Sequence, residues 1–208
     1  MKHARLLLII VILIAFAEDG GGAQRIPQPR IPPLPPSQMT DAHRSALGRF
    51  YRGEETGNIF TTCVRNVELC RAWKPFADHL VAATNSVPAR EKEMLILRTS
   101  WLCRADYDWS HHVVAAKNAG LSGDEILRIT NGPDAQGWSK FDSAVLRAVD
   151  ELHRDQHITD ATWAALRERY TESQLMDAIF TVGQYTMVSM FLNSAGVQLE
   201  PGYSGLPK

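Results

Sequence analysis

The chain has 208 residues, 45% of them apolar, which is enough for one domain with a sizeable core and too few for two. Its formal net charge is −1, and Lys and Arg are not concentrated in any block. This distribution argues against a nucleic-acid partner, because phosphate binding requires a concentrated positive face.

The N-terminus has the pattern of an export signal. A basic start at residues 2–5 leads into an unbroken apolar run of twelve residues, Leu6 to Ala17. A bilayer span needs about 20 residues, so the run matches the apolar region of a secretory signal peptide instead. We predict that residues 1–23 are a signal peptide, and that the protein is periplasmic or secreted with no membrane span after cleavage. An uncleaved N-terminal anchor is the alternative.

Residues 24–40 are rich in proline. Six prolines between residues 27 and 36 prevent a helix and favour an extended polyproline conformation. We interpret the segment as a linker between the export signal and a single domain over residues 41–208.

From Asp41 onward the pattern is helical. Apolar residues recur at helical spacing in residues 69–81, 94–102 and 141–152. Ser122–Glu125 and Thr171–Gln174 are capping boxes, which open helices. The stretch Leu175–Leu192 is apolar almost all round, as in a helix buried in a core or a subunit interface. These signals predict an all-α domain.

The segment from Arg90 to His112 carries the candidate chemistry. Asp108 and His112 are four residues apart and share a helix face. A carboxylate beside an imidazole orients the ring and raises its basicity, which suits general acid–base catalysis. Glu91 and Glu93 point to different faces, so only one can join this site and the other is expected to be solvated.

Simpler interpretations exist for the same residues. Asp108 could pair with Arg104 on its own helix, and His111 is expected to be exposed. Tyr107 is either a packing group or a hydrogen-bond donor of the site. Adjacent histidines diverge on a helix and the usual ligand spacing is missing, so we expect no metal site. The chain also lacks a glycine-rich phosphate loop, so we expect no organic cofactor.

The three cysteines have separate interpretations. Cys63 and Cys70 flank a short corner expected near residues 65–67, and export makes a disulfide between them chemically possible. The alternative is a pair of small buried side chains. Cys103 is then the odd thiol.

The chain resembles the carboxymuconolactone decarboxylase and alkylhydroperoxidase (AhpD-like) superfamily. The segments that carry the resemblance are Arg90-Glu-Lys-Glu-Met-Leu-Ile-Leu-Arg98, Ala105-Asp-Tyr-Asp-Trp-Ser-His-His112, Phe180-Thr-Val-Gly-Gln-Tyr-Thr-Met187 and Leu192-Asn-Ser-Ala-Gly-Val-Gln-Leu199. The resemblance spans roughly residues 45–202. It implies a compact AhpD-like domain of about seven to nine helices that assembles as a homo-oligomer.

The alkylhydroperoxidase motif reads Glu, eleven residues, then C-x-x-C-x-x-x-H. Placing His112 at the histidine puts Glu93 at the acid position and leaves both cysteine positions without cysteine, the second being Asp108. Starting from Cys103 instead puts Glu91 at the acid position but loses the second cysteine and the histidine. We favour the first alignment, which keeps the Glu and the His.

This alignment favours proton transfer over redox chemistry. We expect a decarboxylase-like enzyme that acts without a cofactor on a small carboxylated substrate, with Glu93, Asp108 and His112 moving the proton and Tyr107 donating a hydrogen bond. One alternative is a peroxiredoxin-type antioxidant activity that uses Cys103. Another is a non-catalytic protein that binds a small molecule on the same scaffold.

Overall fold

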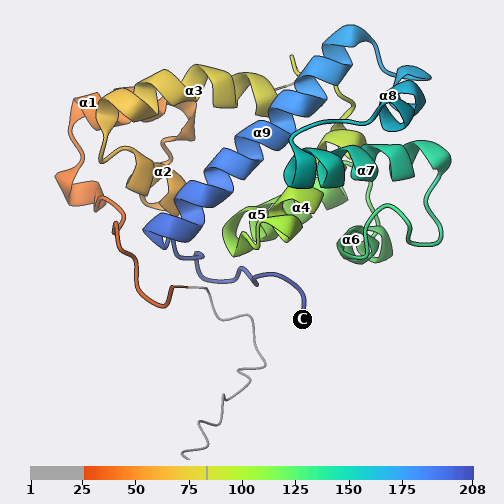
Figure 1. Cartoon of the computed structure of the whole chain (residues 1–208). Helices are drawn as coiled ribbons and strands as arrows, with labels where there is room; N and C mark the ends of the chain where they lie inside the picture. Colours follow the sequence, from red (N-terminus) through yellow and green to blue (C-terminus); the bar gives the residue numbers. More distant parts are fainter. Residues whose placement is uncertain (1–25, 83) are drawn as a thin grey trace, which may run out of the picture.

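A computed structural model describes residues 26–82 and 84–208, and this part of the chain is all-helical with no β-strand. The predicted signal peptide, residues 1–23, lies outside the described residues. Nine α-helices are present in the described part, which confirms the all-α expectation (Figure 1). They are α1 (Asp41–Leu47), α2 (Asn58–Cys63), α3 (Val67–Val81), α4 (Ala89–Leu102), α5 (Asp106–Asn118), α6 (Gly123–Thr130), α7 (Lys140–Asp155), α8 (Asp160–Arg167) and α9 (Glu172–Ala195).

Helix α4 is the centre of the domain, with α5, α6, α7 and α9 packed around it. Every residue from Glu91 to Ser100 is buried, so polar side chains there need internal partners. Arg98 meets this need by donating from Nε and Nη2 to the Asp150 carboxylate at 2.6 and 2.9 Å. The expectation that Glu91 is solvated is wrong, because α4 has no solvent face there. Glu91 is buried and pairs with Arg169 at 3.3 Å.

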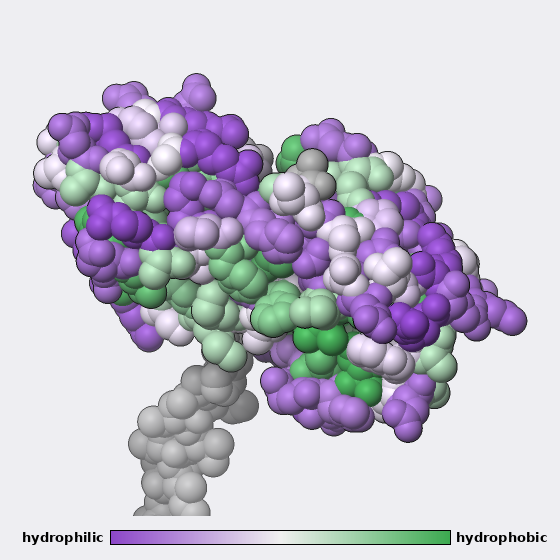
Figure 2. Space-filling view, turned by 90° about the horizontal axis from the view of Figure 1, so that it is seen from above, coloured by the Kyte–Doolittle hydropathy of each residue, from purple (hydrophilic) through white to green (hydrophobic). Residues whose placement is uncertain are grey.

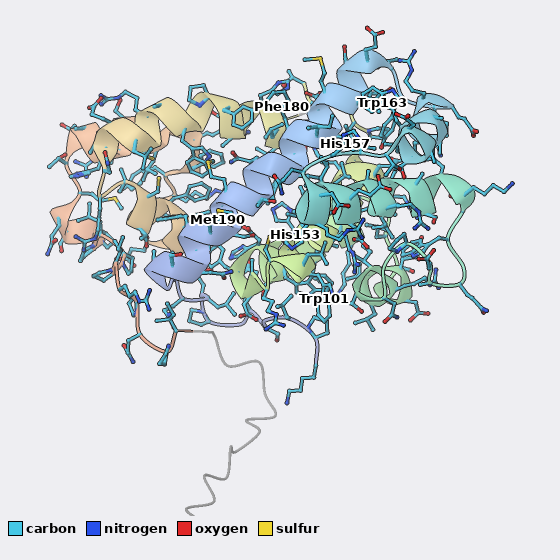
Figure 3. The ribbon with its side chains drawn as sticks, viewed as in Figure 1. Trp101, His153, His157, Trp163, Phe180 and Met190 are labelled. Carbon is cyan, nitrogen blue, oxygen red and sulfur yellow. The ribbon has the colours of Figure 1, made fainter. Side chains whose placement is uncertain are left out.

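Helix α9 begins at the predicted capping box, in which Thr171 and Gln174 bond each other's backbone N–H groups. It is the one helix of the described chain long and apolar enough to span a membrane by length and composition, and half of that window is buried in the domain. Its outer face is apolar as well. The large exposed side chains there are Met176, Phe180, Met187 and Met190, two of which are labelled in Figure 3. The helix is therefore apolar on both its core face and its exposed face.

The Pro-rich segment packs against the domain from residue 26 onward. Leu34 and Met39 are buried in a cluster with Leu47 and Val64. The Leu34 N–H donates to a carbonyl oxygen of α2, and Arg65 donates to carbonyl oxygens of the proline run. The packed unit therefore begins before residue 41, because apolar side chains between the prolines contribute to the core.

The helices form two groups with α9 between them. Helices α1 to α3 pack together on one side, α4 to α8 form the other side, and α9 crosses the molecule between the groups (Figure 1). Viewed from above, apolar surface gathers where the groups meet (Figure 2). A cavity lies between the groups, with walls from α2, α3, α5 and α9.

Candidate active site

The cavity has a volume of about 720 Å³. One wall comes from α2, α3 and the loop before α2, and the other from α5 and α9. The C-terminal segment at Glu200, Pro201 and Tyr203 adds a third side. The polar or aromatic residues that line it are Phe50, Arg52, Glu54, Glu55, Thr56, Asn58, Phe60, Trp73, Tyr107, Asp108, His111, His112, Gln184, Tyr185, Glu200 and Tyr203.

His112 on α5 is paired with Glu93 on α4, as in the favoured motif alignment. The His112 Nδ1–H donates to Glu93 Oε2 at 2.7 Å. The chain reverses between these helices at Arg104, whose φ of 53° lies in the left-handed region that non-glycine residues rarely adopt. This reversal packs α5 against α4 and brings the two side chains together. His112 lines the cavity, whereas the buried Glu93 lies behind it.

Asp108 lines the same cavity on the adjoining turn of α5. It is 4% exposed, and the Ser189 hydroxyl donates to its Oδ2 at 3.4 Å. No ion pair joins it to Arg104 in the described chain, so that interpretation is wrong: Arg104 sits in the reversal, outside the helix. Burial raises the pKa of Asp108 to about 6, against the opposing charge of His112.

The pKa of His112 is also raised. Burial by itself opposes the charged imidazolium, but the hydrogen bond and charge of Glu93, together with the charge of Asp108, outweigh it. The pKa of Asp108, about 6, lies near the range in which a side chain can accept and return a proton, and the raised pKa of His112 favours its imidazolium form. Perturbed carboxylate and imidazole groups that share a cavity are typical of catalytic sites.

Tyr185 is a site residue that the sequence reasoning missed. The Tyr185 and His112 rings form a T-shaped pair, with centroids 4.9 Å apart and an interplanar angle of 89°. Burial, followed by the charges of Asp108 and Glu93, raises its pKa well above the usual value, so the hydroxyl keeps its proton. Neighbouring Gln184 is buried and also lines the cavity. The sequence signal was the polar Gln-Tyr pair inside the otherwise apolar α9.

His111 and Tyr107 also lie at the cavity, and both meet Glu200 from the C-terminal segment. His111 Nε2 is 2.8 Å from Glu200 Oε2, and the Tyr107 hydroxyl donates to Oε1 at 2.7 Å. The expectation that His111 is exposed is therefore wrong, because the C-terminal segment folds back over it. Tyr107 is a cavity residue, but its hydroxyl also accepts from the Ile59 N–H, so it is already engaged.

Cys103 lies outside the cavity lining. Its Sγ is 3.8 Å from Nδ1 of His153, which is labelled in Figure 3, and it also interacts with Ser189 and Thr186 on α9. Burial raises the pKa of its thiol, which disfavours the thiolate that a peroxidase needs. Cys103 is therefore poorly placed and poorly activated as a nucleophile.

Cys63 and Cys70 are free thiols in the structure, so the possible disulfide between them is not formed in it. They are nevertheless neighbours: a thiol–thiol hydrogen bond and burial raise the pKa of Cys63. The corner between α2 and α3 falls at Val64 to Asn66, as predicted. Within residues 26–82 and 84–208, no three His, Cys, Asp or Glu side chains form a group that could hold a metal ion.

The model of the Carboxymuconolactone decarboxylase family matches residues 68–151, which contain Glu93, Asp108 and His112. A comparison with curated proteins gave no match. Solved structures with the same fold are 15–18% identical to the chain, a level that supports similarity of fold alone.

Three of these structures cover most of the chain. The alkylhydroperoxidase AhpD core of an uncharacterized peroxidase-related protein from Ralstonia eutropha JMP134 is 18% identical with a TM-score of 0.70, over 82% of this chain and 93% of that one. An uncharacterized peroxidase-related protein from Silicibacter sp. TM1040 is 15% identical with a TM-score of 0.67, over 88% and 94%. A variant of the debrominase Bmp8 in complex with 2,3,4-tribromopyrrole is 15% identical with a TM-score of 0.65, over 82% and 91%.

The family match contains the helices that carry the Glu93–His112 pair, and the structural matches extend over both groups of helices. Residues 68–151 therefore match the Carboxymuconolactone decarboxylase family, and the chain as a whole has the fold of the AhpD-like structures.

Proposed function

We propose that the protein is an enzyme that transfers a proton on a small molecule bound in the cavity between α3, α5 and α9. His112 is the acid–base group, Glu93 orients it, and Asp108 is the second titrating group. The observation that carries the proposal is the 2.7 Å contact between Glu93 and the ring of a cavity-lining histidine.

The pairing dictates how His112 acts. Because the Glu93 carboxylate accepts the proton on Nδ1, the neutral ring has its lone pair on Nε2, which has no partner within the described chain. Nε2 can therefore take a proton from a bound substrate and return it as imidazolium. The carboxylate fixes the tautomer and stabilises the imidazolium, as in other carboxylate–histidine pairs.

In a decarboxylation the same groups would act in the reverse direction. The bond between the substrate carbon and its carboxylate breaks, carbon dioxide leaves, and the electron pair remains on the carbon. The His112 imidazolium then delivers its proton to that carbon. Asp108, which has a pKa of about 6 and lines the same cavity, would then return a proton to His112.

The lining of the cavity constrains the substrate. Its aromatic side chains suit a ring compound, and the structurally similar debrominase is in complex with a small ring, 2,3,4-tribromopyrrole. Arg52 is the one Lys or Arg side chain among the lining residues, and the acidic residues there outnumber it. A carboxylated substrate would therefore depend on Arg52 for charge compensation.

The two alternatives have less support. A peroxidase would depend on Cys103, which lies outside the cavity lining and has a raised pKa. A non-catalytic binding protein would not need a carboxyl group and an imidazole that both have raised pKa values in one cavity.

The test combines a compound screen with a matched pair of variants. The purified protein is incubated with small ring compounds, carboxylated and not, and their consumption is followed by mass spectrometry. For any compound consumed, His112→Gln should lower kcat/KM by about 100-fold or more, the usual range for loss of an acid–base group. His79→Gln is the control, because His79 pairs with Asp177 at 3.0 Å outside the cavity lining. Full activity in His112→Gln would contradict the proposal.

A further inference from the structure

Helix α5 presents two neighbouring histidines to one cavity. Tyr107, Asp108, His111 and His112 occupy positions i, i+1, i+4 and i+5, which form a strip two residues wide along the helix. All four line the cavity. Adjacent side chains on a helix diverge, but the cavity is wide enough that both His111 and His112 line it.

His111 has its own carboxylate partner, Glu200. That carboxylate accepts from the Asn58 N–H at 2.6 Å and from Tyr107 at 2.7 Å, in addition to its contact with His111 at 2.8 Å. Burial by itself would raise the pKa of Glu200, but these hydrogen bonds lower it to about 2. Glu200 is therefore an ionised acceptor. The His111 proton must then be on Nε2, and the neutral ring carries its lone pair on Nδ1.

Two tyrosine rings stack on the His111 ring. Tyr107 and Tyr203 stack on it with ring centroids at 4.4 and 4.1 Å and interplanar angles of 29° and 26°. The His111 side chain remains 29% exposed, and with Nε2 occupied by Glu200, Nδ1 is the ring nitrogen left for a ligand. A ligand at this ring therefore meets a fixed acceptor, Nδ1.

The charge around the cavity defines which ligands fit this acceptor. Glu54, Glu55, Asp108 and Glu200 line it against Arg52 alone, so an anionic ligand would be repelled. We propose that His111, held by Glu200, is a second substrate-contacting group, whose Nδ1 accepts a hydrogen bond from the hydroxyl or N–H of a small neutral ring compound.

This inference rests on the proposed function and narrows its substrate class to neutral ring compounds, so it favours proton transfer on such a compound over decarboxylation of a carboxylated one. His112 transfers the proton, while His111 holds a donor group elsewhere on the same ring. Compounds that carry a hydroxyl or N–H are selected over their methylated or carboxylated counterparts.

The test uses phenol, anisole and benzoate as probes, because they share a ring but offer a donor, no donor and a charge. Calorimetric titration of the full-length protein at neutral pH should show phenol binding more tightly than either of the others. In His111→Phe, which keeps an aromatic ring in the stack, phenol should bind roughly five- to tenfold more weakly, as expected for loss of one hydrogen bond. Anisole should bind this variant as it binds the parent. His79→Phe, the matched control, should leave both affinities unchanged.

A second measurement needs no variant at position 111. In protein labelled with ¹⁵N-histidine, phenol should shift the Nδ1 resonance of His111, and anisole should not. Equal binding of phenol and anisole by the parent, or phenol binding unchanged in His111→Phe, would overturn the inference. The two proposals fail separately: turnover that survives His112→Gln contradicts the proposed function, whereas these binding results concern His111 alone.

Discussion

The Glu93–His112 pair makes a sharp prediction about a single pKa. Replacing Glu93 with Gln keeps the size of the side chain and an oxygen that can accept from Nδ1–H, but removes the negative charge. The hydrogen bond and charge of Glu93 are the largest of the influences that raise the pKa of His112. The substitution should therefore lower that pKa while leaving the fold in place.

The magnitude follows from the geometry. At 2.7 Å in a buried site, a hydrogen bond to a charged group is worth about 1.5–3 kcal/mol, against about 0.5–1.5 kcal/mol for a neutral one. The difference of about 1–2 kcal/mol corresponds to a fall of roughly one pKa unit, since one unit is about 1.4 kcal/mol. Asp108 still favours the imidazolium, so the fall is partial.

The assay is a titration of the histidine ring resonances by NMR in parent and variant. Asp177→Asn is the matched control, because it removes the carboxylate partner of His79 and should leave His112 unchanged. An unchanged His112 titration in Glu93→Gln would refute the role given to Glu93. For a substrate found in the screen, the limb of the pH–rate profile that reports His112 should move to lower pH by the same amount.

The same pair predicts how stability depends on pH. A histidine whose pKa is raised by folding stabilises the protein below the pKa of the unfolded chain, and this contribution is lost as pH rises through the folded value. Glu93→Gln should therefore cost more stability at about pH 6 than at about pH 9.

Three further predictions concern other parts of the molecule. Asp108→Asn should stabilise the protein by up to about 3 kcal/mol above pH 6, because burial raises the pKa of Asp108 from 3.8 to about 6. The gain should vanish near pH 4, where the carboxyl group is protonated in both the folded and the unfolded protein. Denaturant unfolding measures the gain, and a gain that does not change with pH would contradict this reasoning. Oxidised protein should contain a Cys63–Cys70 disulfide that adds about 2.5 kcal/mol by the loop-entropy relation, and thiol counting that finds three free thiols under oxidising conditions would exclude it. If α9 forms a homo-oligomer interface, Met187→Lys with Met190→Lys should lower the mass measured by light scattering, and an unchanged oligomer would place the interface elsewhere.

Much of the fold could be predicted from local patterns. The capping boxes at Ser122 and Thr171 open helices as expected, and α4 begins directly after Pro88. Caps and periodicity act within a few residues, so they are readable from the chain. Burial was less predictable. Glu91 is buried because neighbouring helices pack around α4, and the local sequence of α4 does not show this.

The candidate site divides in the same way. The sequence alone determined that Asp108 and His112 share a helix face, and motif spacing indicated Glu93 as the partner 19 residues away. Only the tertiary structure decided that His111 belongs to the cavity, because its partner Glu200 is 89 residues away and no local pattern links them. Tyr185 entered the site in the same manner, through the packing of α9 on α5. Helical spacing sets which side chains share a face, but which face meets a cavity depends on long-range packing.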